Sequence, residues 1–318
     1  MFDTAVIGLG CASYTAAIYA ARYKLTTLIV GETEGGMGIT AAEVGNWPGD
    51  IEVKGPDLME RFRKHALSFE EVTHKTARVE AIEPLDLARG DKGFRLRFQS
   101  GETAEAKTVI IATGSNKRHL GVKGEEEFSG KGVTYCATCD AFFYRGKDVA
   151  VIGGGDSAVE GAAIAAQVAK TVYLIHRRKE FRAEPYWIDK VKERKNIVLI
   201  LENAITEVKG DTKVRSVTLS KPFNGSTDLP VDGVFIEIGA DPAVGLATPL
   251  GCTLDERGYL KVGDDMSTNV PGIFGAGDVT SGSNHFAQFT TAAGEGAIAA
   301  NSVFAYLQGG GGHAGSMG

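Results

Sequence analysis

Short apolar runs recur along the chain, and two of them lead through a glycine turn into an alanine-rich stretch. The first run is residues 4–7, followed by the stretch at residues 14–23. The second is residues 148–152, followed by the stretch at residues 159–169. A β-branched run that stops at glycines and leads into good helix formers predicts strand, turn and helix in that order. The chain therefore carries two copies of the unit from which parallel α/β sheets are built.

The rest of the pattern also predicts an α/β protein. Residues 56–69 have the apolar spacing of an amphipathic helix, and residues 190–219 read as a charged helix followed by alternating strands. Residues 35–38 read as a loop because of their glycines. We expect the remaining strands at residues 26–30, 77–115, 171–175, 232–239 and 272–279, a closing helix at 288–302, hinges at 116–119 and 240–242, and a flexible tail at 309–318.

The first glycine turn contains Gly8, Gly10 and Ser13 in a Gly-x-Gly-x-x-small pattern. Such a turn lets the backbone approach a pyrophosphate, which the N–H groups at the start of the helix can bind. Glu32 follows the next strand, where an acid would accept the hydroxyl groups of an adenine ribose. The pattern predicts a dinucleotide site, and the alternative is a strand-turn-helix unit that binds nothing.

The second turn contains the residues Gly153, Gly155, Asp156 and Ser157. It follows a β-branched strand and precedes a helix, as a dinucleotide-binding turn requires. This second strand-turn-helix unit is better formed than the first.

The strand after the second turn ends in His176, Arg177 and Arg178, with Arg182 four residues further on. A carboxylate at this place would repel a 2′-phosphate, whereas guanidinium groups bind one with paired, charge-assisted hydrogen bonds. The expected ligand is NADPH rather than NADH, and the alternative is a solvated basic loop. His176 could bind phosphate or simply end the strand.

Cys136 and Cys139 are separated by two residues and are followed at once by Asp140. Such a pair can form and reopen a small disulfide ring, and the adjacent acid can move a proton there. A structural zinc site would need four ligands, but Cys11 and Cys252 each stand alone. The pair therefore predicts a redox centre, against a zinc half-site or two buried thiols.

Two strands end in small residues. Thr113 and Gly114 follow one of them, where the backbone can pass close to a bound cofactor. Gly277 and Asp278 follow the other, and Asp278 could accept a hydrogen bond from a polyol chain. The alternative for Asp278 is a helix N-cap.

Composition narrows the class of protein. The chain has 318 residues, 43% hydrophobic and 23% charged, with a net charge of −6, which is typical of a globular protein of about two domains. The negative charge argues against a nucleic-acid surface. The sequence contains no run of 18 to 20 apolar residues, so it predicts no membrane span. The N-terminus runs directly into the first strand without a basic segment, so we expect no signal peptide and a cytoplasmic protein.

Together these motifs describe an electron path. A nicotinamide nucleotide would deliver a hydride, a flavin would accept it, and the flavin would reduce the disulfide. Residues 272–302 return to the type of sequence found in the first unit, so the flavin domain is expected to be discontinuous, with the nicotinamide domain inserted into it.

From about residue 1 to 308, the chain resembles the low-molecular-weight thioredoxin reductases of the pyridine nucleotide-disulfide oxidoreductase family. The matching stretches are Glu43, Val44, residues 46–50, 112–114, 136–140, 153–157, 176–178, 181–183 and 277–278.

The resemblance implies FAD in residues 1–117 and 246–308, NADPH in residues 118–245, and a homodimer. It implies that Cys139 faces the flavin, that Cys136 meets the disulfide of thioredoxin or a thioredoxin-like protein, and that Asp140 serves as acid or base. It also adds the flavin-domain residues Gly36, Asn46 and Gln288 to the expected cofactor site. We expect no metal site, because Cys11 and Cys252 each stand alone.

The chain departs from the family pattern at Met37 and Ala287, where the family has glutamine and arginine. These departures motivate a second hypothesis, a non-catalytic redox or nucleotide sensor on the same fold. A third hypothesis is a related flavin disulfide reductase that serves another redoxin or takes electrons from ferredoxin, although the intact arginine set argues against ferredoxin.

Overall fold

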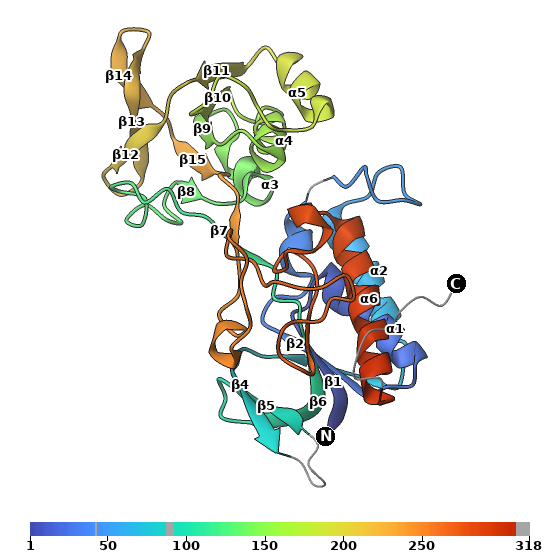
Figure 1. The fold of residues 1–318 in the computed structure, drawn as a ribbon. Coiled ribbons are helices and arrows are strands. Elements are labelled where there is room, and N and C mark those ends of the chain that lie inside the picture. The colour runs from blue at the N-terminus through green and yellow to red at the C-terminus, as the bar shows by residue number, and fades with distance from the viewer. Residues whose placement is uncertain (42, 87–91, 310–318) are drawn as a thin grey trace. The chain divides into compact units, whose positions relative to one another are not determined.

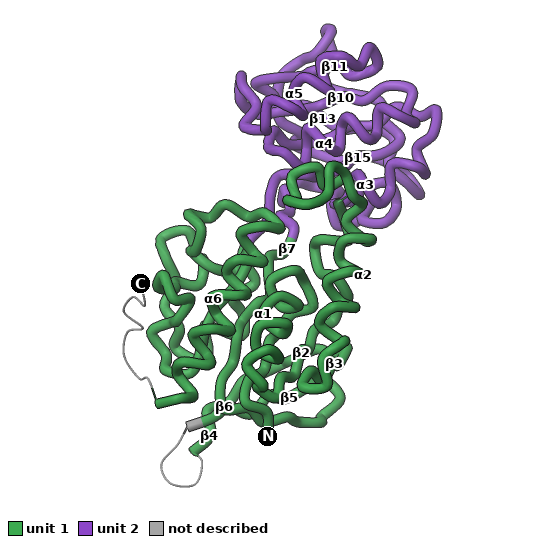
Figure 2. Tube along the Cα trace, turned by 90° about the vertical axis from the view of Figure 1, so that its right-hand side faces the viewer, with its two compact units in different colours: residues 1–116, 242–318 green, residues 117–241 purple. Residues whose placement is uncertain are grey.

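The computed structural model describes residues 1–41, 43–86 and 92–309. The chain forms two compact units (Figure 2). Unit 1 contains Met1–Asn116 and Pro242–Gly318, and unit 2 contains Lys117–Asp241. Unit 1 is therefore built from two separate parts of the sequence.

Unit 1 has a seven-stranded sheet with the order β3-β2-β1-β6-β5-β4, and β17 also pairs with β6. Its elements in chain order are β1 (Phe2–Ile7), α1 (Cys11–Arg22), β2 (Thr27–Gly31), the 3-10 helix η1 (Gly36–Thr40), α2 (Gly55–Ala66), β3 (Val72–Thr76), β4 (Val79–Asp86), β5 (Lys92–Phe98), β6 (Thr103–Ile111), η4 (Thr248–Leu250), β17 (Ile273–Gly275), η5 (Gly282–His285) and α6 (Phe289–Leu307). The strands β3, β2, β1, β6 and β17 run parallel, whereas β4 and β5 are antiparallel additions.

The central strands of unit 1 are buried on both faces. Val6, Ile29 and Ile110 belong to the core that α1, α2 and α6 cover, and these helices gather on one side of the sheet (Figure 1). Neighbouring residues such as Ile7 and Ile111 belong to a second core on the opposite face. This alternation explains why these strands read as continuous apolar runs.

Unit 2 has a five-stranded parallel sheet with the order β11-β10-β9-β15-β8 and a three-stranded antiparallel sheet, β12-β13-β14. Its elements are β8 (Val133–Thr134), α3 (Ala137–Asp140), the 3-10 helix η3 (Ala141–Tyr144), β9 (Asp148–Ile152), α4 (Asp156–Ala165), β10 (Thr171–His176), α5 (Pro185–Lys192), β11 (Ile197–Leu201), β12 (Ile205–Gly210), β13 (Val214–Phe223), β14 (Ser226–Pro230) and β15 (Gly233–Ile236). The strands β7 (Ser115–Lys117) and β16 (Ala240–Pro242) lie where the chain passes between the units.

The two faces of the parallel sheet in unit 2 have different partners. Val149 and Val151 of β9 pack with α3, α4 and α5, whereas Ala150 and Ile152 pack toward the antiparallel sheet. The parallel sheet thus has helices on one face and strands on the other.

The structure confirms the predicted α/β fold class and the strand-turn-helix order of both glycine turns. Several predicted helix limits are wrong. Helices α1 and α4 each begin three residues earlier than predicted, because the residue after the last turn glycine already has helical backbone. Helix α4 ends at Ala165 rather than Ala169, and α6 continues past Ser302 to Leu307.

Three local expectations also need correction. The charged helix expected from Lys190 lies earlier, at Pro185–Lys192. The stretch expected as a loop at residues 35–38 contains the start of η1. Of the predicted flexible tail at 309–318, residues 310–318 lie outside the described part of the chain.

Candidate active site

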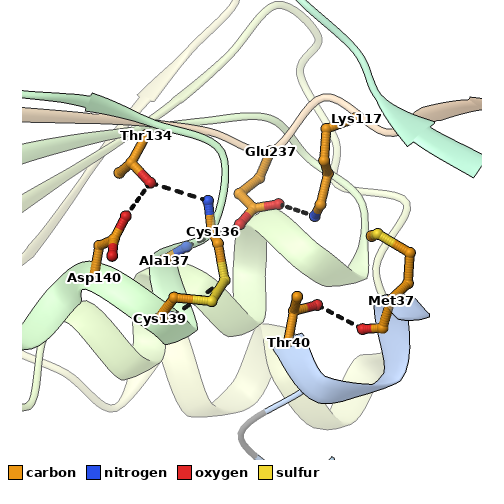
Figure 3. The surroundings of a disulfide bond; sticks show 9 residues. All are labelled: Met37, Thr40, Lys117, Thr134, Cys136, Ala137, Cys139, Asp140 and Glu237. Carbon is orange, nitrogen blue, oxygen red and sulfur yellow. Dashed lines mark hydrogen bonds and ion pairs between the residues drawn. A yellow bond between two sulfur atoms is a disulfide. The ribbon is translucent and has the colours of Figure 1, made fainter. Parts of the chain in front are cut away.

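Cys136 and Cys139 form a disulfide at the start of the short helix α3 (Figure 3). Their Cα atoms are 5.4 Å apart, within the usual range for a disulfide. Cys136 occupies the N-cap position, and its Sγ accepts a hydrogen bond of 3.2 Å from the backbone N–H of Cys139. The helix therefore directs an N–H group at the sulfur of Cys136, where it would stabilise a thiolate after reduction.

Asp140 is tied to the disulfide through Thr134. The Thr134 hydroxyl donates a hydrogen bond to Asp140 Oδ2 and accepts one of 3.3 Å from the N–H of Cys136 (Figure 3). The backbone N–H of Asp140 also donates to the carbonyl of Cys136 at 3.2 Å. The carboxylate predicted to move protons is thus held by the same segment that carries the cysteines.

A second carboxylate lies beside the disulfide segment, and it belongs to none of the sequence motifs described above. Glu237 Oε1 accepts a hydrogen bond of 3.0 Å from the N–H of Ala137, and its Oε2 lies 2.9 Å from Lys117 Nζ. Glu237 directly follows the apolar strand β15 and is buried. A charged residue in an otherwise apolar strand sequence was the signal that could have found it, because buried charges are usually paired.

The first glycine turn closes tightly against β6. Gly8 has φ +128°, and a Cβ there would overlap the carbonyl oxygen of Ala112 and lie 2.9 Å from Ser13 Oγ. Gly10 is the N-cap of α1, and no atom lies within 4 Å of where its Cβ would be. Ser13 Oγ is buried without a hydrogen-bond partner in the described residues. The start of α1 has no side-chain cap and no acidic residue in its first turn.

Gly36 and Gly277 approach this turn from other parts of unit 1. A Cβ on Gly36 would lie 3.3 Å from the Cα of Gly10, and one on Gly277 would lie 3.0 Å from the Cβ of Ala12. The sequence-predicted glycines of three segments therefore meet around the start of α1.

Asp278 lies in a buried turn next to this site. Burial, and then the charge of Glu295, raise the pKa of Asp278 to about 6. The predicted alternative of a helix N-cap is wrong, because Gln288 is the N-cap of the following helix α6. Glu295 itself accepts hydrogen bonds from the N–H of Gly277 and the hydroxyl of Thr280, both at 2.8 Å.

The other predicted residues of unit 1 form local contacts. Thr113 Oγ1 donates to the carbonyl of Ala243 at 2.7 Å, and Gly114 follows with φ +67°. Asn46 Nδ2 donates to Gln288 Oε1 at 3.0 Å. Glu32 is exposed after β2, and its carboxylate lies 3.9 Å from Arg78.

The second glycine turn has the same geometry in unit 2. Gly153 has φ +147°, and a Cβ there would overlap the carbonyl oxygen of Glu237 and lie 2.6 Å from the Cβ of Ala158. Gly155 is the N-cap of α4, which begins with Asp156 and Ser157. Asp156 Oδ1 accepts a hydrogen bond of 2.6 Å from the N–H of Glu184.

The basic residues gather beside this second turn. His176 ends β10, its ring stacks on Phe181 at 5.6 Å, and its Nε2 is buried without a partner in the described residues. Burial, with the charges of Arg182, Arg178 and Arg177, lowers the pKa of His176. The N–H of Arg182 donates to the carbonyl of Gly154 at 2.7 Å. Within the described ranges no carboxylate pairs with these three exposed guanidinium groups.

The described residues contain no group of three or more histidine, cysteine or acidic side chains that could hold a metal ion. No helix in the described ranges is both long enough and apolar enough to cross a membrane.

The model of the pyridine nucleotide-disulphide oxidoreductase family matches residues 2–296. The chain belongs to this family. The thioredoxin reductase of Mycolicibacterium smegmatis is 41% identical over 301 residues, which cover 93% of this chain and 94% of that protein. A Pseudomonas fluorescens protein named glucosaminate ammonia-lyase is 45% identical over 316 residues, covering 96% and 95%. The crystal structure of Lactococcus lactis thioredoxin reductase has a TM-score of 0.90 at 36% identity and covers 97% of this chain and 100% of that one.

Membership of the pyridine nucleotide-disulphide oxidoreductase family implies a flavin and a nicotinamide nucleotide. The turns of both units fit such groups. In unit 1, the start of α1 has no side-chain cap, and the Ser13 hydroxyl has no partner in the described part of the chain, so both offer donors to a pyrophosphate. In unit 2, guanidinium groups that have no carboxylate partner among the described residues stand beside the start of α4, which has no side-chain cap.

Proposed function

We propose that this protein is a thioredoxin reductase that uses NADPH and FAD to reduce the disulfide of thioredoxin. The observation that carries the proposal is the Cys136–Cys139 disulfide at the start of α3, with Asp140 fixed beside it. Thioredoxin reductases that match nearly the whole chain at about 40% identity support it.

Within this proposal, unit 1 binds FAD and unit 2 binds NADPH. The proposed FAD-binding residues are Gly8, Gly10, Ser13, Glu32, Gly36, Asn46, Thr113, Gly114, Gly277, Asp278 and Gln288. The proposed NADPH-binding residues are Gly153, Gly155, Asp156, Ser157, His176, Arg177, Arg178 and Arg182. The arginines would bind the 2′-phosphate, because their charges are not neutralised by carboxylates in the described residues.

The bound flavin supplies two-electron transfer from NADPH to the Cys136–Cys139 disulfide. The resulting Cys136 thiolate attacks the thioredoxin disulfide, and one thioredoxin sulfur leaves as a thiolate that Asp140 can protonate. Cys139 then attacks the Cys136 sulfur, which reforms the internal disulfide and releases thioredoxin with both of its cysteines reduced. Two electrons enter and two leave in each cycle.

The name of the Pseudomonas fluorescens relative describes the elimination of ammonia. A disulfide has no function in such a reaction. Elimination of ammonia involves no net transfer of electrons to a protein disulfide. The Cys136–Cys139 pair beside Asp140 therefore favours a reductase. The same pair also weighs against a non-catalytic sensor.

We also propose that the working protein is a homodimer, which the family resemblance supports. Sedimentation velocity at micromolar concentration would give a particle of twice the 33.6 kDa chain mass. A particle of single-chain mass would contradict this part of the proposal.

A turnover assay tests the proposed function. Purified protein with bound flavin is mixed with NADPH and oxidised thioredoxin, and the absorbance of NADPH is followed. The proposal expects NADPH oxidation that depends on thioredoxin and is much slower with NADH. NADPH oxidation at the same rate with and without thioredoxin, or none with either nucleotide, would contradict it.

A further inference from the structure

Glu237 is a buried carboxylate that contacts the redox segment of unit 2 without belonging to its sequence motif. Its side chain is 5% exposed, and it stands directly after β15. Figure 3 shows it on the far side of the segment from Asp140 and pointing toward Lys117.

The contacts of Glu237 reach the backbone between the two cysteines. One oxygen accepts the N–H of Ala137 at 3.0 Å, and Ala137 lies between Cys136 and Cys139. The other oxygen lies 2.9 Å from the ammonium group of Lys117, whose side chain is 24% exposed. A Cβ on Gly161 of α4 would lie 2.8 Å from the Cβ of Ala137 and 3.9 Å from Glu237 Cγ. Helix α4 therefore packs closely against the redox segment beside Glu237.

We propose that Glu237 is a positioning residue for disulfide exchange: it fixes the segment between the cysteines, and its charge, offset by Lys117, sets the acidity of the two thiols. The inference rests on the proposed function, because it concerns the same dithiol.

The physical basis is the charge placed beside a potential thiolate. The N–H of Cys139 that points at Cys136 Sγ would stabilise a thiolate there, and a nearby negative charge opposes this effect. The charge that faces Glu237 is that of Lys117 at the end of β7, whereas α3 contributes an N–H group and α4 contributes Gly161. Burial raises the pKa of Glu237, and Lys117 and the N–H of Ala137 oppose that rise. The pair as a whole is close to neutral when both groups are ionised.

Asp140 does not duplicate this role. Its carboxylate accepts the hydroxyl hydrogen of Thr134, not the N–H of Ala137. The dithiol thus has one carboxylate within its own helix and another supplied by the residue that follows β15, 100 residues after Ala137 in sequence.

Charge-changing variants test the inference. Glu237→Gln keeps an oxygen for the N–H of Ala137 and removes the negative charge. Lys117→Met removes the positive charge at a partly exposed position, and the double variant removes both. Each flavin-bound enzyme is reduced with dithiothreitol, and its rate of alkylation by iodoacetamide is measured across pH. Thermal unfolding shows whether each variant is folded.

The inference expects opposite shifts of the alkylation profile. Glu237→Gln removes a negative charge near the thiols, so it should move the inflection to lower pH by about half a unit. Below the inflection, alkylation should then be roughly threefold faster than in the wild type. Lys117→Met should move it to higher pH, and the double variant should lie near the wild type. A structural role alone would not give opposite shifts that cancel. An unchanged profile in either single variant, or shifts in one direction, would overturn the inference.

The outcome separates this inference from the proposed function. Reduction by dithiothreitol requires neither NADPH nor thioredoxin. Thioredoxin turnover with unshifted profiles would overturn only the role of Glu237. Shifted profiles without thioredoxin turnover would support that role and overturn the proposed function.

Discussion

The four cysteines of this protein have two kinds of surroundings. Cys11 is buried in α1, and burial, followed by the charge of Asp278, raises its pKa to about 12. Burial also raises the pKa of Cys252. Cys136 instead stands at the start of a helix with an N–H directed at its sulfur. Since only a thiolate is an effective nucleophile, the chemistry belongs to the Cys136–Cys139 pair.

This difference predicts selective alkylation. After native reduction with dithiothreitol, brief iodoacetamide treatment at pH 7.5 should modify Cys136 and Cys139 and leave Cys11 and Cys252 free. Peptide mass spectrometry identifies the modified residues, and alkylation in denaturant provides the control in which all four react. Labelling of Cys11 as fast as Cys136 would contradict this account.

Asp278 should make stability depend on pH in the flavin-free protein. Its folded pKa of about 6 lies above the ordinary value of 3.8, so folding favours the protonated form. The stabilisation is present at low pH and is lost as the pH rises through about 6. Relative to Asp278→Asn, the wild type should therefore lose roughly 2 kcal/mol of unfolding free energy between pH 4 and pH 7.5.

Urea denaturation at several pH values measures this difference. Asp264→Asn, at an exposed position, serves as the matched control and should track the wild type. A constant difference between the wild type and Asp278→Asn across this pH range would show that Asp278 does not titrate in this way.

At the scale of elements, each glycine turn joins a buried strand to the start of a helix. In unit 2, β9 ends at Ile152 just before Gly153, α4 begins after Gly155, and β10 ends at His176. Glycine is required at Gly153 because its φ is +147° and the carbonyl of Glu237 occupies the place of a Cβ. The turn and the redox segment are therefore packed against the same residue.

Gly153→Ala should destabilise unit 2 strongly. A side chain there would have to adopt a positive φ and would also overlap the carbonyl of Glu237. We therefore expect the free energy of unfolding to fall by about 3 kcal/mol. Gly225→Ala, which has φ +85° but open space around its Cβ, should cost about 1 kcal/mol. Urea denaturation compares the two variants, and equal losses would contradict the steric argument.

The basic residues after β10 should distinguish the two nicotinamide nucleotides. Arg177→Ala with Arg178→Ala removes the proposed partners of the 2′-phosphate, so the KM for NADPH should rise about tenfold or more, with little change for NADH. Arg194→Ala, an exposed arginine elsewhere in unit 2, is the control. If the double variant kept the wild-type ratio of the two KM values, the assignment would fail.

The strands, turns and redox segment could be predicted because each is marked by residues that are close together in the sequence. Glycines that interrupt β-branched runs locate the strand ends, and the cysteine spacing locates the redox segment. The starts of α1 and α4 were missed because Ala, Ser and Asp after the last glycine suit a turn as well as a helix. The position of Glu237 beside the redox segment could not be predicted in this way. Its ion-pair partner Lys117 lies 120 residues earlier, and no local pattern connects the two.

At the scale of the whole molecule, the chain returns to unit 1 after completing unit 2. The final strand β17 pairs with β6, and α6 packs on α1. The two helices approach closely, because a Cβ on Gly296 would overlap the carbonyl of Ala12. Gly277 and Asp278 reach the first glycine turn through this return. Unit 1 therefore needs both ends of the sequence to bring together the residues of its proposed dinucleotide site.

The central claim is that electrons pass from NADPH to the Cys136–Cys139 disulfide and on to thioredoxin. Its most direct test is an anaerobic titration of the flavin-bound protein with NADPH, followed by oxidised thioredoxin, while the visible spectrum is recorded. A Cys139→Ser variant, which should keep its flavin, is titrated in parallel. We expect NADPH to bleach the flavin band in both proteins and thioredoxin to restore it in the wild type alone. Failure of NADPH to bleach the band, or recovery in Cys139→Ser equal to that of the wild type, would contradict the account.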